Sequence, residues 1–128
     1  MQNNGPTNTG PTAANPTIVD LSQIKNSLQG NIPILRKLVD HFLNTYPQQL
    51  LDLQTAVIDQ NAEALLEKAH AFKGTLLNFG AQKAVAHAYA LEQMGAAAKL
   101  DDAEKILTEL NTDLLEIRAF FSRPDWAD

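Results

Sequence analysis

The fold is decided by one stretch in the middle of the chain, Ala69-His70-Ala71-Phe72-Lys73-Gly74-Thr75-Leu76-Leu77-Asn78-Phe79-Gly80-Ala81. Its apolar residues, with one that precedes it, recur at steps of four, three, four and three: Leu65, Ala69, Phe72, Leu76 and Phe79. That spacing places them on one side of a helix. We therefore expect a helix with this side turned toward a hydrophobic core.

His70 is the unusual residue of this stretch. It lies roughly 100° around the helix from Ala69, and Lys73 and Gly74 are its neighbours at the i+3 and i+4 positions. Glycine inside a helix costs about 1 kcal/mol relative to alanine, and here the missing side chain leaves room for an incoming group to reach the imidazole. The ammonium of Lys73 suits an anion on that ring. The pattern indicates an exposed histidine able to carry a phosphoryl group.

The same residues resemble the signature of histidine-containing phosphotransfer (HPt) domains, a His-x-x-Lys-Gly core followed by a Gly-Ala or Gly-Leu pair. The matching positions are His70, Lys73, Gly74, Gly80 and Ala81. Similar features extend from about Asp20 to about Leu110 and include Gly30, Leu35, Leu38, Phe42, residues 61–65, Leu91, Glu92 and Gly95. The resemblance implies a helical bundle that transfers phosphoryl groups.

Length and composition narrow the class of protein. A chain of 128 residues can form one domain with a single core. We expect a disordered tail over residues 1–17, a helical bundle over 18–122 and a short C-terminal tail over 123–128. The absence of cysteine excludes disulfides and thiolate metal sites. Met1 and the short tail favour a free-standing protein.

Charge and hydropathy point to a soluble, cytoplasmic protein. Residues 1–17 lack the apolar run of a signal peptide, and no later segment is apolar enough to span a membrane. The net charge of −5 and the scattered basic residues argue against binding to nucleic acid.

Helical periodicity covers the rest of the chain. It predicts a short helix from about residue 18 to 28 and longer helices over about 32–59, 62–79, 82–98 and 102–121, with Asn31, Asn61 and Asp101 as caps. Pro47 leaves open one bent helix or two shorter ones, and we favour the bent helix. Connections of two to four residues favour antiparallel neighbours. We predict an all-α fold, an antiparallel up-down four-helix bundle with a short additional N-terminal helix, and the resemblance implies the same.

A metal site is the competing interpretation of the histidine. Glu67 and His70 form a Glu-x-x-His pair, the spacing used by di-iron bundles, but such sites need a second pair. The residues three before His41 and three before His87 are apolar, and Lys73 would repel a cation. We expect no metal and no cofactor, and we expect His41 and His87 to be solvated.

Two leucines share the strip of surface that carries His70. Leu66 and Leu77 lie at the i−4 and i+7 positions, so they are either core residues or, with Glu67, a patch for docking a partner. The family usually has a small residue at position 77. Glu92 resembles the glutamate of the family's Leu-Glu pair, or it is simply a surface carboxylate.

The sequence holds no nucleotide-binding motif, so we expect no kinase activity. The resemblance implies response-regulator receiver domains and a hybrid sensor histidine kinase as partners of a monomeric phosphorelay intermediate. His70 would accept the phosphoryl group from a receiver's phospho-aspartate and pass it to an aspartate of another receiver. Lys73 would offset charge, and Gly74 would give the partner clearance. The alternative is a helical adaptor that binds a receiver or another protein without transfer.

Overall fold

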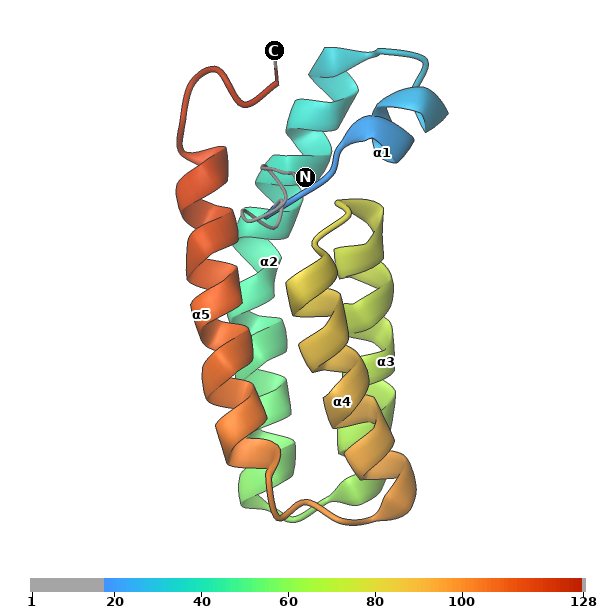
Figure 1. The fold of residues 1–128 in the computed structure, drawn as a ribbon, viewed down its shortest axis with the longest axis vertical. Helices are drawn as coiled ribbons and strands as arrows, with labels where there is room; N and C mark the ends of the chain where they lie inside the picture. Colours follow the sequence, from blue (N-terminus) through green and yellow to red (C-terminus); the bar gives the residue numbers. More distant parts are fainter. Residues whose placement is uncertain (1–17, 128) are drawn as a thin grey trace, which may run out of the picture.

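The fold is an antiparallel helical bundle (Figure 1). A computed structural model describes residues 18–127, and the expected disordered tail lies outside them. The helices are α1 (Ser22–Ser27), α2 (Ile32–Ile58), α3 (Ala62–Asn78), α4 (Gln82–Ala97) and α5 (Ala103–Phe121). No strand forms within the described residues. The predicted all-α fold, a four-helix bundle with a short additional helix at the start, is confirmed.

The apolar side of α3 that the sequence spacing predicts to be buried lies in the core. Leu65, Ala69, Phe72 and Leu76 are at most 1% exposed, and Phe79, just past the end of the helix, is 4% exposed. They pack in one cluster with buried residues from the other three long helices. Because the buried side of α3 is fixed in this way, the opposite side faces solvent.

The helices α3 and α4 approach each other closely at Gly95. A Cβ atom at Gly95 would lie 2.6 Å from the backbone nitrogen of Leu66 and 2.8 Å from the carbonyl oxygen of Ala62. No side chain fits in so small a gap. The glycine therefore lets α4 lie directly against α3, as Figure 1 shows.

Pro47 lies inside α2, which is a single helix through that position. Proline removes one hydrogen bond of the helix. Here Pro47 faces solvent, while Tyr46 and Leu50 beside it are buried in the core. The side that packs is therefore intact, and α2 is one helix rather than the two shorter ones that Pro47 left open.

Two of the three predicted caps are present. The Asn31 side chain accepts a hydrogen bond from the backbone of Ile34 at 3.2 Å, and that of Asn61 accepts one from Ala64 at 3.0 Å. The prediction for Asp101 was wrong, because α5 begins one residue later, with Asp102 as its N-cap and no side-chain cap.

The first helix begins later than its periodicity predicts. Val19 and Leu21 are buried before α1 starts, and the backbone nitrogen of Asp20 donates a 3.0 Å hydrogen bond to the carbonyl oxygen of Phe79. Gly80 lies beside this contact at a φ of +59°, where a Cβ would collide with the carbonyl oxygen of Asp20. The N-terminal segment is thus tied to the turn between α3 and α4, and this tie overrides the local helical pattern.

The segment after α5 folds back on the bundle. The Trp126 ring lies 5.0 Å from the Phe121 ring, centroid to centroid, and the Arg36 guanidinium carbon of α2 lies 5.2 Å from the Trp126 centroid. Lys25 Nζ donates a 3.2 Å hydrogen bond to the Ala127 carbonyl. Helix α1 and the segment after α5 therefore meet at one end of the bundle. None of the helices described is both long enough and apolar enough to cross a lipid bilayer.

Candidate functional site

His70 projects from the solvent-facing side of α3. Its side chain is 68% exposed, although the preceding residue, Ala69, is fully buried. Imidazole Nδ1 lies 3.0 Å from carboxylate oxygen Oε2 of Glu92 on α4. Within residues 18–127, Nε2 has no hydrogen-bond or ion-pair partner. One ring nitrogen is therefore held by the protein while the other is open to solvent.

Glu92 joins the histidine to the lysine of the motif. Its second oxygen, Oε1, lies 2.7 Å from Lys73 Nζ, and the two side chains are only 15% and 20% exposed. Oε1 has no well-aligned hydrogen bond, so the contact is best described as an ion pair. The Lys73 ammonium, with a smaller contribution from His70, holds the pKa of the Glu92 carboxyl below its ordinary value against the opposing effect of burial. Glu92 is therefore ionised at neutral pH.

The ionised carboxylate fixes the tautomer of the imidazole. A carboxylate only accepts hydrogen bonds, so the nitrogen that faces it must carry the proton. The proton is then on Nδ1, and the lone pair is on Nε2. The lone pair that is open to solvent is therefore that of Nε2.

Gly74 borders the histidine with open space. A Cβ atom placed on it would meet no atom within 4 Å. Packing within the bundle therefore does not require a glycine at this position, in contrast to Gly95. The room beside the imidazole that the sequence predicts is present.

Lys73 points toward α4. Its ammonium lies against Glu92 and 5.0 Å from the centre of the Tyr89 ring. Lys73 and His70 are thus linked through the Glu92 carboxylate, which both of them contact. The sequence pattern predicted Lys73 as a site residue and left two interpretations of Glu92, but Tyr89 was not predicted to belong to the site.

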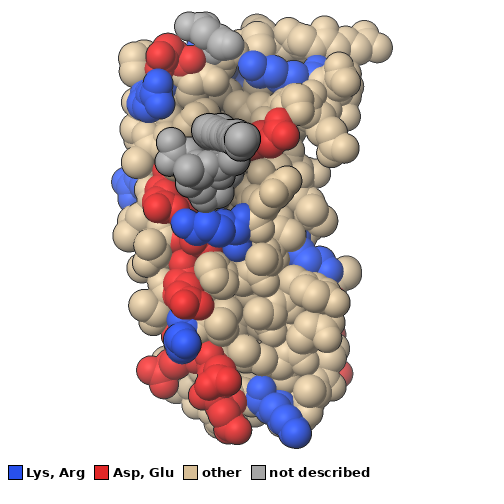
Figure 2. All heavy atoms as spheres, viewed as in Figure 1, with Lys and Arg blue, Asp and Glu red and all other residues tan. Residues whose placement is uncertain are grey.

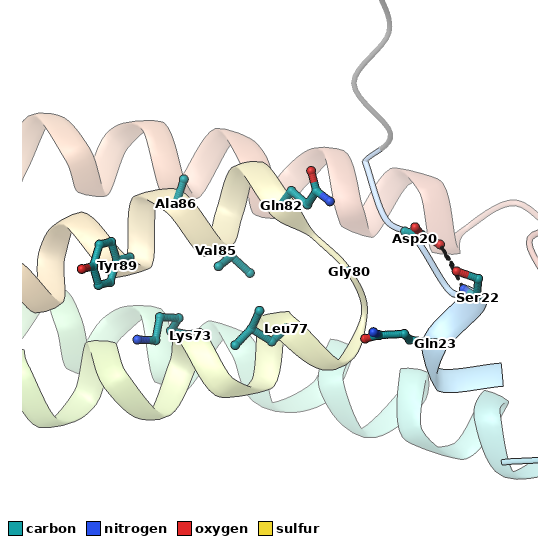
Figure 3. A pocket seen from close by; sticks show the side chains of 10 residues that line it. All are labelled: Asp20, Ser22, Gln23, Lys73, Leu77, Gly80, Gln82, Val85, Ala86 and Tyr89. Carbon is teal, nitrogen blue, oxygen red and sulfur yellow. Dashed lines mark hydrogen bonds between the residues drawn. The ribbon is translucent and has the colours of Figure 1, made fainter. Parts of the chain in front are cut away.

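The three predicted docking residues differ in exposure. Leu77 is 55% exposed, Glu67 is exposed, and Leu66 is half-buried where α3 meets Gly95 of α4. Leu77 lines a groove of about 650 Å³ between α3 and α4. In Figure 3, Lys73 and Leu77 enter the groove from α3, Val85 and Tyr89 come from α4, and residues around α1 close one end.

The other two histidines have different surroundings. His41 is exposed, as expected. The expectation that His87 is solvated was wrong: its side chain is 24% exposed, Nδ1 contacts Asp113, and Nε2 lies 3.5 Å from Glu109 Oε1. Asp113, on α5, is 3% exposed and has Lys83 Nζ at 3.7 Å. This cluster joins α4 to α5 and lies outside the groove.

Charge is unevenly spread over the surface. In Figure 2, acidic side chains gather along the side of the molecule where α5 lies. The acidic residues of α5 include Glu104, Glu109 and Glu116. Among residues 18–127, no three carboxylate or imidazole groups are placed to share a metal ion.

Comparison with known proteins agrees with this geometry. The model of the Hpt domain family matches residues 37–120. The chain belongs to the Hpt domain family. A similar solved structure is that of histidine-containing phosphotransfer protein B (HptB) from Pseudomonas aeruginosa PAO1, with 25% sequence identity and a TM-score of 0.76. The alignment covers 84% of this Hpt protein and 94% of HptB. No curated protein matches the sequence. The resemblance found in the sequence is confirmed, and with it a role in phosphotransfer within phosphorelays.

Proposed function

We propose that this Hpt protein is a phosphorelay intermediate. His70 accepts a phosphoryl group from the phospho-aspartate of one receiver domain and passes it to an aspartate of another. The observation that carries this proposal is the histidine itself, with Nδ1 held by Glu92 and Nε2 open to solvent. A hybrid sensor histidine kinase is the upstream source of the group, and the Hpt protein acts as a monomer.

The transfer is a nucleophilic substitution at phosphorus. The Nε2 lone pair forms the new N–P bond while the P–O bond to the receiver's aspartate breaks, and that carboxylate leaves with the electron pair. The proton on Nδ1 stays in place, so the ring gains positive charge next to the Glu92 carboxylate, which stabilises it. Passing the group onward reverses these steps at a second receiver.

Lys73 and Gly74 support this chemistry in different ways. A phosphoryl group on His70 adds negative charge close to Glu92, and the Lys73 ammonium, 2.7 Å from Glu92, offsets it. Gly74 leaves open space beside the imidazole for the partner's active-site loop. The receiver docks on the groove that Leu77 lines, with Glu67 and the exposed part of Leu66 at the margin.

Labelling by a phosphorylated receiver domain tests the proposal. We expect label on the wild-type Hpt protein and on His41→Gln, a matched control with an exposed histidine on α2. His70→Gln should take no label and should keep its helicity and melting temperature, because residue 70 is exposed. Label that persists in His70→Gln would disprove the assignment. A receiver that binds the wild-type protein without labelling it would support the adaptor function.

A further inference from the structure

Tyr89 is an aromatic residue of the site without an assigned role. It lies on α4, three residues before Glu92, and its side chain is 49% exposed. The ring borders the same groove as Lys73 (Figure 3), and the Lys73 ammonium lies 5.0 Å from the ring centroid. A cation within about 6 Å of a ring face is attracted by the quadrupole of the ring.

Lys73 is therefore held from two sides. Glu92 Oε1 supplies a negative charge at 2.7 Å, and the Tyr89 ring supplies an attractive surface. Lysine has a flexible four-carbon chain and a strongly hydrated ammonium. An ion pair at the edge of a groove competes with water, whereas a ring beside the ammonium limits the positions that the side chain can take.

We propose that Tyr89 is a positioning residue whose ring keeps the Lys73 ammonium on Glu92. The ring thereby controls how much negative charge Glu92 presents to Nδ1 of His70. This inference rests on the proposed function, since its consequence for phosphotransfer requires a phosphoryl group on Nε2.

The consequence concerns the lifetime of phospho-His70. When the P–N bond breaks, the electron pair returns to Nε2 and phosphorus forms a bond to water or to a carboxylate oxygen. A proton on Nδ1 makes the ring a better leaving group, and a nearby carboxylate favours that proton. With Lys73 on Glu92, part of the negative charge is neutralised, so the phosphorylated ring is longer-lived. Without the ring of Tyr89, Lys73 leaves Glu92 more often and the lifetime shortens.

The test compares Tyr89→Phe, which keeps a ring face, with Tyr89→Leu, which keeps an apolar side chain without one. The first measurement is the pKa of the Glu92 carboxyl by carbon-13 NMR in the unphosphorylated protein, with circular dichroism at each pH to verify folding. We expect both Tyr89→Leu and Lys73→Met to raise this pKa toward the ordinary value, and Tyr89→Phe to leave it near that of the wild type. Val85→Ala, which alters the same groove, should not change it.

The second measurement is the hydrolysis of phospho-His70 at neutral pH after the receiver is removed. We expect a lifetime about threefold shorter in Tyr89→Leu, the size of change expected from losing a cation–π contact at an exposed site, and an unchanged lifetime in Tyr89→Phe. The inference is overturned if the Glu92 pKa is the same in Tyr89→Leu and the wild type, or if Tyr89→Phe behaves like Tyr89→Leu. Weaker receiver binding with an unchanged Glu92 pKa would also overturn it, since Tyr89 would then be only a docking residue. A wild-type protein that takes no label refutes the proposed function, while the Glu92 titration still tests the position of Lys73.

Discussion

The site depends on single residues whose surroundings differ even when their type is the same. Gly74 and Gly95 both lie inside helices, yet a Cβ would meet nothing within 4 Å at the first and backbone atoms of α3 at the second. The first glycine leaves space for a partner, and the second allows two helices to touch. A substitution of each by alanine separates these two roles.

We expect Gly74→Ala to keep or raise the free energy of unfolding, by up to about 1 kcal/mol, because alanine is the better helix former. The same change should slow transfer from a phosphorylated receiver, and Gly74→Leu should slow it further. Gly95→Ala should destabilise the fold by about 1–3 kcal/mol through overpacking. Chemical denaturation measures the free energy of unfolding, and labelling kinetics measure the rate of transfer. Wild-type transfer by Gly74→Leu would show that clearance at this position is unimportant.

Glu92 makes stability depend on pH. Because Lys73 lowers its pKa in the folded state, the unfolded chain binds more protons between the folded value and the ordinary value of about 4.3. Stability therefore rises with pH across this window. The contribution is fully present above the unfolded pKa and is lost as pH falls through the folded one.

We expect Glu92→Gln to remove this part of the pH dependence. Unfolding free energies of the wild-type and variant proteins, measured by urea denaturation from about pH 3 to pH 6, should converge toward the acid end of the range. Glu92→Gln should also transfer more slowly, because a neutral amide neither offsets charge on the ring nor fixes its tautomer. Parallel stability curves over the whole range would contradict the assignment of the pH dependence to Glu92.

At the scale of the elements, α4 takes part in two different polar contacts. On one side Glu92 meets His70 and Lys73 of α3, and on another His87 meets Asp113 of α5. The second contact involves a buried carboxylate. Removing one partner of a buried pair leaves an uncompensated charge, whereas replacing both by apolar groups is often neutral or stabilising.

We therefore expect His87→Leu to destabilise the protein by about 1–3 kcal/mol. This is less than the usual cost of removing one partner of a buried pair, because Lys83 remains near Asp113. The double variant His87→Leu/Asp113→Leu should recover most of this loss. Phosphotransfer by the double variant should equal that of the wild type, since the cluster lies outside the groove. Thermal melts and labelling assays check both expectations. A double variant less stable than His87→Leu would mean that the pair stabilises the fold beyond mutual neutralisation.

The groove between α3 and α4 gives a prediction for binding. Leu77 is 55% exposed, so Leu77→Ala should leave the melting temperature nearly unchanged. If the receiver docks there, its affinity should fall by about 1–2 kcal/mol, the usual effect of losing an apolar contact at an interface. Isothermal titration with an unphosphorylated receiver measures this, and Leu51→Ala, an exposed leucine on α2, is a matched control. Equal affinities of the two variants would remove Leu77 from the docking surface.

At the scale of the whole molecule, the features predicted from the sequence are those set by local pattern. The spacing of Leu65, Ala69, Phe72 and Leu76 is sufficient to define the buried side of α3, and from it the exposure of His70. The caps Asn31 and Asn61 also act within one turn of helix. These features need no knowledge of how helices pair.

The features that were missed depend on contacts between helices. The start of α1 is set by a hydrogen bond from Asp20 to Phe79, far along the chain. One signal for the site was available: the tight turn at Gly80 sets the register of the two antiparallel helices. His70 lies ten residues before Gly80, and its partner Glu92 lies twelve residues after it. Lys73 lies seven residues before Gly80, and Tyr89 lies nine residues after it. Each pair is thus almost equally far from the turn, as residues that face each other on antiparallel helices are. The environment of His87 depends on the pairing of α4 with α5, for which the sequence offered no comparable marker.

The packing of Trp126 has a practical consequence. It is the only tryptophan of the chain, and its ring rests on Phe121 and beneath Arg36, against α5 and α2. The groove, in contrast, is built mainly from α3 and α4. Intrinsic fluorescence excited at the indole band therefore reports on the end of the bundle where the segment after α5 packs against α5 and α2. Its emission should shift to longer wavelength when the protein unfolds and stay constant when a receiver occupies the groove, so one native fluorophore can follow folding in the presence of a bound partner.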